Sequence, residues 1–111
     1  MVNIHEILLL LLIHTISDFC SQTRKMAENK SQSIKWLSIH VFIYILPFLV
    51  FGWKFTLVNF ILHWIIDFIS SRASGYYYKQ KNFYAFFNVI GFDQYLHIVS
   101  LVFTYYYMVV K

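Results

Sequence analysis

The sequence predicts an all-α integral membrane protein, a four-helix bundle with an interfacial aromatic segment before its last helix. Hydrophobic residues make up 59% of the 111 residues and charged residues only 13%, which lies outside the usual range for a soluble domain. The aromatic share of 22% is more than a small water-facing fold can hide. Continuous Leu- and Ile-rich runs, rather than alternating apolar and polar positions, favour helices over a membrane β-barrel.

A chain of this length is expected to form a single transmembrane domain, residues 1–111. The first apolar run is near the short limit for a membrane span, and Ser21–Lys35 reads as a polar connection after it. Pro47 is expected to kink the second helix. We expect the helices to cover about residues 4–20, 36–51, 55–70 and 92–110.

The stretch between the third and fourth predicted helices mixes two kinds of signal. Serines and a glycine in Ser70–Gly75 are expected to end the third helix. In Tyr76–Ile90, aromatic residues are interleaved with lysines and asparagine, a mixture typical of the membrane interface. We therefore predict a short amphipathic segment lying on the membrane surface, with a lid over the site as the second interpretation.

The nine Lys and Arg residues set the predicted orientation. They form no basic helix or RNA-binding motif, so no nucleic acid partner is expected. Most of them lie in the first and third connections, and connections rich in Lys and Arg stay in the cytoplasm. The chain is therefore predicted to be a multi-pass protein of the cell (inner) membrane with both termini outside. The cytoplasmic residues are Arg24, Lys25, Lys30, Lys35, Arg72, Lys79 and Lys81, against Lys54 and Lys111 on the other side.

Histidine and aspartate recur at one spacing inside the apolar runs. All three aspartates of the chain lie four residues from a histidine. Residues four apart share a helix face, so each pair directs an imidazole and a carboxylate toward one point. Ionisable residues inside membrane helices are costly and face the bundle interior. The pairs are His14 with Asp18, His63 with Asp67, and Asp93 with His97.

The predicted topology brings these pairs to one depth. The first and third helices descend toward the cytoplasm, whereas the fourth ascends and carries its pair in the reverse order. His40, one turn into the ascending second helix, reaches the depth of the other histidines. We therefore expect four histidines in one layer and three aspartates about 6 Å nearer the cytoplasmic face.

This set of side chains predicts a metal centre. Neutral imidazoles and carboxylates suit a divalent metal, with zinc as the first choice and manganese or iron as alternatives, and such bundle sites often hold two ions. The single cysteine, Cys20, excludes a cysteine zinc cluster within the chain. Sequence leaves open whether one or two ions bind, and which aspartates are ligands rather than hydrogen-bond partners of histidines. The predicted metal ligands are His14, Asp18, His40, His63, Asp67, Asp93 and His97.

Two glutamines lie beside the predicted ligands. Gln22 is one turn beyond Asp18, and Gln94 neighbours Asp93, so both are candidates to orient water or substrate, with a solvated boundary position as the alternative. A metal-free network of hydrogen bonds that locks the helices together is the structural alternative for the whole set. The candidate catalytic residues are Asp18, Asp67, Asp93, Gln22 and Gln94.

The motifs form an ordered set along the chain: His14-x3-Asp18-Phe19-x2-Gln22, Ala27-Glu28-Asn29-Lys30, His40, His63-x3-Asp67 and Asp93-Gln94-x2-His97. This set resembles an uncharacterised family of small multi-spanning membrane proteins from bacteria and their phages, which carries a domain-of-unknown-function label. The resemblance covers nearly the whole chain, although Tyr76–Ile90 has no matching motif. More loosely, the H-x3-D helices resemble those of bacterial membrane-bound metal-dependent hydrolases, an analogy at the level of the fold.

We expect a metal-dependent hydrolase whose centre opens to the cytoplasmic side and acts on a lipid, lipid-linked or phosphate-containing substrate. The metal would lower the pKa of a bound water, and an aspartate free of the metal would act as general base. The alternatives are a metal-ion or proton binding or transport protein, and a small phage or host-modifying interaction protein without catalysis. Membrane lipids are the expected partners, and association of identical chains is left open.

Overall fold

The computed structural model describes residues 3–20 and 33–110, and these residues form helices and no β-strand. The prediction of an all-α chain with four helices is therefore confirmed for the described part. Three of the four helices end in a short segment of different helical type. In chain order the elements are α1 (Ile4–Thr15), the π-helix η1 (Ile16–Cys20), α3 (Ile34–Ile45), the 3₁₀-helix η2 (Leu46–Phe51), α4 (Trp53–Lys79), α5 (Phe83–Tyr105) and the π-helix η3 (Tyr106–Val110).

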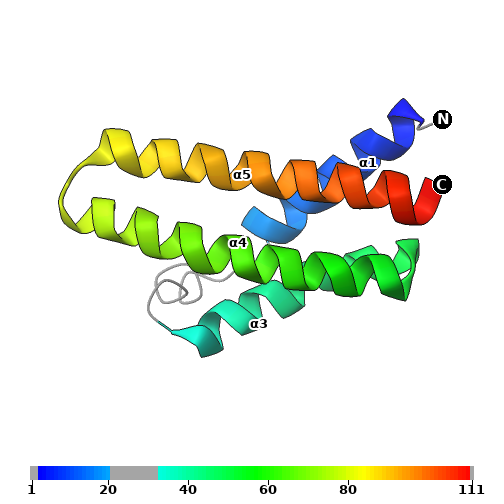
Figure 1. Cartoon of the computed structure of the whole chain (residues 1–111), viewed down its shortest axis with the longest axis horizontal. Helices are drawn as coiled ribbons and strands as arrows, with labels where there is room; N and C mark the ends of the chain where they lie inside the picture. Colours follow the sequence, from blue (N-terminus) through cyan, green and yellow to red (C-terminus); the bar gives the residue numbers. More distant parts are fainter. Residues whose placement is uncertain (1–2, 21–32, 111) are drawn as a thin grey trace.

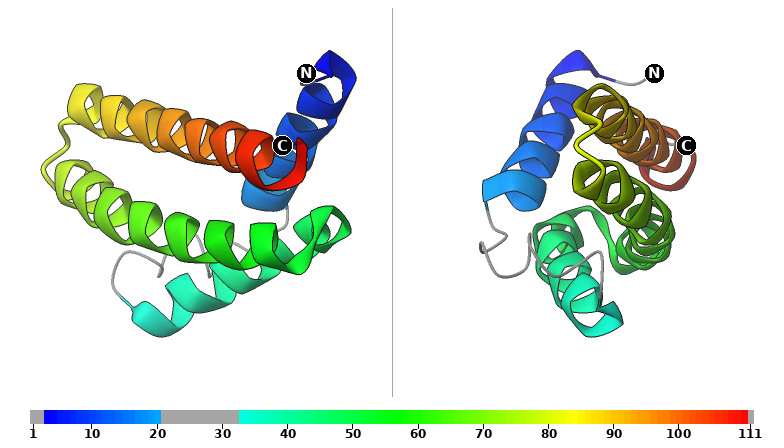
Figure 2. Two further views of the ribbon diagram at one scale, coloured as in Figure 1. Left: turned by 45° about the vertical axis from the view of Figure 1, so that its right-hand side comes forward. Right: turned by 90° about the vertical axis from the view of Figure 1, so that its left-hand side faces the viewer.

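The two longest helices, α4 and α5, form an antiparallel hairpin that the other two helices cover. α4 and α5 lie side by side along the long axis of the molecule (Figure 1). α3 packs on α4, while α1 packs on α5, and η1 reaches α3. Viewed nearly along the hairpin, the four helices surround one interior (Figure 2, right). The start of α1 and the end of α5 lie at the same end of the bundle (Figure 1).

Local sequence signals explain where the helices begin and change. The side-chain oxygens of Asn3 and Ser33 accept hydrogen bonds from first-turn backbone N–H groups of α1 and α3, at 2.8 and 3.5 Å. Pro47 lies in the first turn of η2, where the α-helix gives way to a 3₁₀-helix, because proline lacks a backbone N–H. Gly52 separates η2 from α4 with a φ of 115°, a conformation that favours glycine.

The predicted end of the third helix at Ser70–Gly75 is wrong, and Tyr76–Ile90 does not form a segment separate from the long helices; its place at the membrane surface stays a prediction. α4 continues to Lys79, and α5 already begins at Phe83. A glycine inside a helix costs only about 1 kcal/mol relative to alanine, so it does not stop a helix that has a packing partner. Because α4 and α5 pack against each other, each supports the other in this stretch.

The turn between α4 and α5 has the geometry of a helix C-cap followed directly by an N-cap. Lys81 has a left-handed φ of 58°, and the Asn82 N–H donates to the Tyr77 carbonyl at 3.0 Å. The side chain of Asn82 then accepts a hydrogen bond from the Ala85 N–H at 3.2 Å. One residue thus closes α4 and opens α5.

The interior of the bundle is more polar than its surface. Among the described residues, ten buried side chains are polar or charged and nine are apolar, whereas 29 large hydrophobic side chains are exposed. The buried apolar side chains include one connected group, here called the apolar cluster. It lies at the end of the bundle that carries the start of α1 and the end of α5. Its members are Leu10, Tyr44, Ile45, Phe48, Phe55, Leu101 and Tyr105.

Two helical stretches of the described chain are long and apolar enough to cross a membrane. They are Ile34–Phe51, which joins α3 and η2, and Phe83–Val109, which covers nearly all of α5 and η3. Both coincide in part with spans predicted from sequence. The other two predicted spans, the orientation and the placement of the termini stay predictions.

Candidate metal centre

A polar stripe runs along the buried face of α4. Its side chains recur at every fourth residue and are all buried. Residues four apart share a helix face, so the stripe faces the interior over several turns. The middle two members lie at the level where the other three helices bring in their own polar side chains. The stripe consists of Asn59, His63, Asp67 and Ser71.

Three histidines from three helices meet at the carboxylate of Asp67. The Nε2 atoms of His40 on α3 and His63 on α4 lie 3.1 and 3.2 Å from Asp67 Oδ2. His97 Nε2 on α5 lies 3.0 Å from Asp67 Oδ1. The rings of His63 and His97 stack, with centroids 4.0 Å apart. Side chains far apart in sequence thus converge on one buried carboxylate.

A second carboxylate, Asp18, enters the same group from η1. Its Oδ1 lies 3.1 Å from His40 Nε2 and 3.7 Å from His63 Nε2. The π-helical turn at Ile16–Cys20 adds a residue per turn and changes the direction in which Asp18 points relative to His14. Such π-helical turns recur at functional sites of helical proteins. Here the turn directs Asp18 toward the histidines of α3 and α4.

The third carboxylate, Asp93, completes the group on α5. Its Oδ1 lies 3.2 Å from His97 Nε2 and accepts a hydrogen bond from the Ser70 hydroxyl. The side chain of Asp93 is 13% exposed, whereas those of Asp18 and the three histidines are at most 5% exposed. The group is therefore nearly sealed from solvent and is most accessible beside Asp93.

His63 is the histidine whose surroundings fit a ligand best. Neither ring nitrogen makes a hydrogen bond to a described residue, although Nε2 lies close to Asp67 and the side chain is 2% exposed. A buried imidazole without hydrogen bonds is costly, and bound ions are one recognised reason for such a group. Nε2 lies within 3.7 Å of carboxylate oxygens of both Asp18 and Asp67, where a cation would be bound.

The spacing of the donor atoms also fits a metal ion. Ligands bound at about 2.0–2.2 Å in a tetrahedron lie roughly 3.3–3.6 Å from one another, and octahedral ligands lie somewhat closer. The nitrogen–oxygen distances here span 3.0–3.7 Å. Two sets of donors lie close enough to share an ion, so this buried cluster could bind metal. The sets are Asp18, His40, His63 and Asp67, and Asp18, Asp93 and His97.

His14, a predicted ligand, belongs to neither set, and its two nitrogens have other partners. Nε2 lies 3.0 Å from Gln94 Oε1, and Nδ1 lies 2.7 Å from the Tyr44 hydroxyl. An amide oxygen only accepts, so Nε2 donates to Gln94 and Nδ1 accepts from Tyr44. The neutral ring is fully hydrogen-bonded in this tautomer. His14 therefore packs against the ring of His97, and its hydrogen bond toward the carboxylates runs through Gln94.

Gln94 connects two of the carboxylates. Its Nε2 donates to Asp93 Oδ2 at 3.0 Å and to Asp18 Oδ2 at 3.2 Å. Because His14 fixes the amide oxygen, the amide nitrogen must face the carboxylates. The structure thus places Gln94 beside both carboxylates, while the other candidate glutamine, Gln22, lies outside the described residues.

Sequence reasoning missed several side chains of this region. Tyr44 contacts His14 through its hydroxyl and stacks its ring on His63, with centroids 3.9 Å apart. It lies four residues after His40, so helical spacing alone could have found it. Ser70 carries no such signal, because its contact to Asp93 depends on how α4 and α5 pair. Asn59 lies four residues before His63 on the same stripe.

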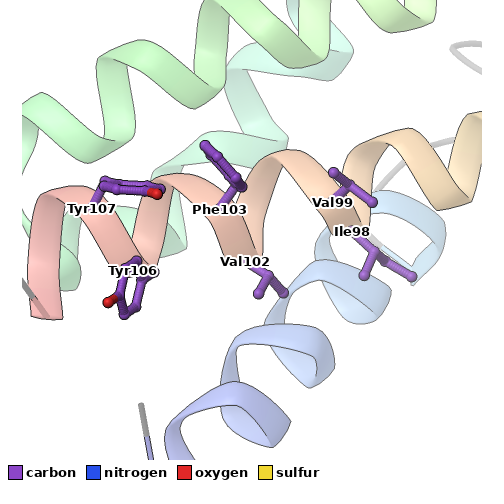
Figure 3. Close-up of a pocket in the computed structure, with 6 residues that line it drawn as sticks. All are labelled: Ile98, Val99, Val102, Phe103, Tyr106 and Tyr107. Atoms are coloured by element: carbon purple, nitrogen blue, oxygen red, sulfur yellow. The ribbon is translucent and has the colours of Figure 1, made fainter. Parts of the chain in front are cut away.

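A pocket of about 550 Å³ lies elsewhere, along α5 and η3 (Figure 3). It is lined by apolar and aromatic side chains, among them Val102 and Phe103. The buried histidines and aspartates described above are here called the histidine–aspartate cluster; its members are Asp18, His40, His63, Asp67, Asp93 and His97. None of them lines this pocket. We therefore assign this pocket to the apolar surface and not to the centre.

Comparisons with known proteins identify a family. No curated protein and no solved structure matches the chain. A family model matches residues 7–111, which include every histidine and aspartate of the cluster. That model carries the description "Protein of unknown function", and the chain belongs to this family, DUF3307.

Proposed function

We propose that this protein is a metal-dependent hydrolase of the cell membrane, with its metal centre inside the helix bundle. The observation that carries the proposal is the convergence of His40, His63 and His97 on the buried Asp67 carboxylate, together with the absence of hydrogen bonds at His63 to described residues. A purely structural network would satisfy its buried polar atoms with hydrogen bonds. Zinc is our first choice of metal, because nitrogen and carboxylate donors at this spacing suit it.

The distribution of polar and apolar side chains supports insertion in a membrane. In the described part of the chain, ten polar or charged side chains are buried and 29 large hydrophobic side chains are exposed. Soluble proteins show the reverse, with hydrophobic side chains mostly buried and polar ones mostly exposed. Lipid would cover the exposed apolar surface, and the bundle would shield the ionisable groups from lipid. We propose that all four helices span the membrane, with both termini outside as the basic residues predict.

The residues of the cluster would have different roles in the reaction. A bound divalent ion would supply Lewis-acid polarisation of the substrate and activation of water. Asp93 is the most exposed carboxylate of the group; its Oδ1 lies beside His97, and its Oδ2 accepts a hydrogen bond from Gln94. Its Oδ1 is the oxygen that would face an ion, and its Oδ2 would accept a proton from the attacking water as general base. Gln94, fixed by His14, would orient that water or the substrate.

The side chains around the histidine–aspartate cluster favour a substrate that enters from one end of the helix bundle. The apolar cluster lies beyond the histidines, toward the end of the bundle that carries the start of α1 and the end of α5. Its packed side chains, apolar apart from the tyrosine hydroxyls, fill that end in the described part of the chain, which argues against a proton or ion pathway within one chain. Lipids, lipid-linked compounds and phosphate esters at the cytoplasmic face remain the substrates we propose.

Asp67→Asn tests the hydrolase proposal directly. The full chain, purified in detergent and loaded with zinc, would be assayed with a fluorescent phospholipid in mixed micelles and with a soluble phosphate ester. We expect turnover in the wild type that a chelator abolishes and zinc restores, and a loss of at least about 100-fold in Asp67→Asn, since Asp67 contacts three of the histidines.

His5→Ala is the matched control, because His5 is exposed at the start of α1. Circular dichroism would show whether each variant keeps its helices. Full turnover in folded Asp67→Asn, or turnover unaffected by chelator, would contradict the proposal.

A further inference from the structure

The two oxygens of the Asp67 carboxylate face different histidines. Oδ2 faces His40 and His63, at 3.1 and 3.2 Å from their Nε2 atoms. Oδ1 faces His97, at 3.0 Å from Nε2. A carboxylate that served one ion would need only one of these sides. Asp67 instead presents one oxygen to His40 and His63 and the other to His97.

The two oxygens of the Asp18 carboxylate also face different neighbours. Its Oδ1 faces His40 and His63, whereas its Oδ2 accepts a hydrogen bond from Gln94. The same Gln94 nitrogen also donates to Asp93 Oδ2, so the second oxygen of Asp18 lies on the side of Asp93. Two carboxylates from different helices therefore present one oxygen to each side of the cluster.

We propose that the cluster holds two divalent ions, one in each set of donors, bridged by the carboxylate of Asp18, which belongs to both sets. His40 and His63 bind the first ion, and His97 and Asp93 bind the second. The proposal rests on the metal centre of the proposed function and specifies its stoichiometry and ligands. Carboxylates that span two ions about 3.5–4 Å apart are the usual arrangement of two-metal sites, including those of helical bundles.

The balance of charge supports two ions rather than one. The cluster contains three carboxylates, and His14 is fixed as a neutral ring by its two hydrogen bonds. One divalent ion would leave a net negative charge in a nearly sealed interior, which is costly. Two ions, with neutral imidazoles, leave a net charge of about +1 by the same count. Such a centre would attract an anionic group, and we infer a phosphate ester as the substrate class.

Asp93→Asn separates the two sides, because Asp93 belongs to the second set of donors and not to the first. Metal-free full-length protein in detergent would be saturated with Zn²⁺, and bound zinc per chain counted by elemental mass spectrometry. We expect two ions per chain in the wild type and in His5→Ala, and one in Asp93→Asn. His40→Ala, on the other side, should also fall to one.

Loading with Mn²⁺ gives an independent readout that needs no variant. Two manganese ions that share a carboxylate couple magnetically, so the electron paramagnetic resonance spectrum should broaden and lose the resolved hyperfine pattern of an isolated ion. A wild type that saturates at one ion with an isolated-ion spectrum would overturn the two-ion inference and leave a one-metal hydrolase intact. Two ions retained in folded Asp93→Asn would overturn the assignment of ligands. No bound ion at all would remove the proposed function as well.

Discussion

His14 and His63 each begin a copy of the same spacing, a histidine followed four residues later by an aspartate, but their surroundings differ. His63 lies on the regular helix α4, and its Nε2 is 3.2 Å from the aspartate of its own motif. Its ring makes no hydrogen bond to a described residue. His14 precedes a π-helical turn, and its two nitrogens contact Gln94 and Tyr44.

This difference shows that the spacing brings a histidine into the interior without deciding its role. The phase of the helix and the hydrogen bonds of the second nitrogen decide it. We infer that His63 is a metal ligand and that His14 is a positioning residue, which acts through Gln94 on Asp18 and Asp93. The comparison can be tested by changing each histidine in turn.

The largest effect is expected for His63→Ala. The substitution removes a donor nitrogen of the first set, so ion content should fall by one per chain and hydrolysis should be lost. Elemental mass spectrometry on detergent-purified protein measures this, with His5→Ala as control. Unchanged ion content in a well-folded variant would show that His63 is only a packing residue and would remove the contrast with His14.

A smaller effect is expected for His14→Ala. The ligand atoms remain, so the protein should still reach full ion content at saturation. Loss of the partner that orients Gln94 should weaken metal affinity by about 10–100-fold, the usual range for groups that position ligands. Competition with a chelator of known affinity would measure the change. If His14→Ala instead lost an ion even at saturating zinc, His14 would be a ligand after all.

Much of this arrangement could be predicted from sequence because it depends on local periodicity. Continuous apolar runs predicted four helices, and spacings of four residues predicted which polar side chains face inward. The grouping of His40, His63 and His97 followed from helix direction and depth alone. The extent of α4 and α5 could not be predicted, because Gly75 and the serines before it are helix breakers only where no packing partner stabilises the helix.

The different roles of the residues within the cluster could not be predicted from the sequence, for a different reason. It depends on which oxygen or nitrogen faces which neighbour, and that follows from side-chain directions in the assembled bundle. The π-helical turn that separates His14 from Asp18 has no clear sequence signal. Tyr44 shared a helix face with His40, but nothing in the sequence indicated that its hydroxyl would meet the first helix.

Tyr44→Phe gives the smallest and most specific test of the comparison. The substitution keeps the ring that stacks on His63, with centroids 3.9 Å apart, and removes only the hydroxyl that donates to His14. Ion content should stay unchanged, and metal affinity should fall less than tenfold, since His14 keeps its bond to Gln94.

The free energy of unfolding should fall by about 1 kcal/mol, because a buried nitrogen of His14 loses its hydrogen bond. Chelator competition and thermal unfolding in detergent measure the two quantities, and Tyr84→Phe, on an exposed face of α5, is the matched control. A loss of affinity in Tyr44→Phe as large as in His14→Ala would mean that the tyrosine hydroxyl, through the tautomer of His14, controls the orientation of Gln94. A loss of the ion itself would assign the hydroxyl to the metal and contradict the donor sets proposed here.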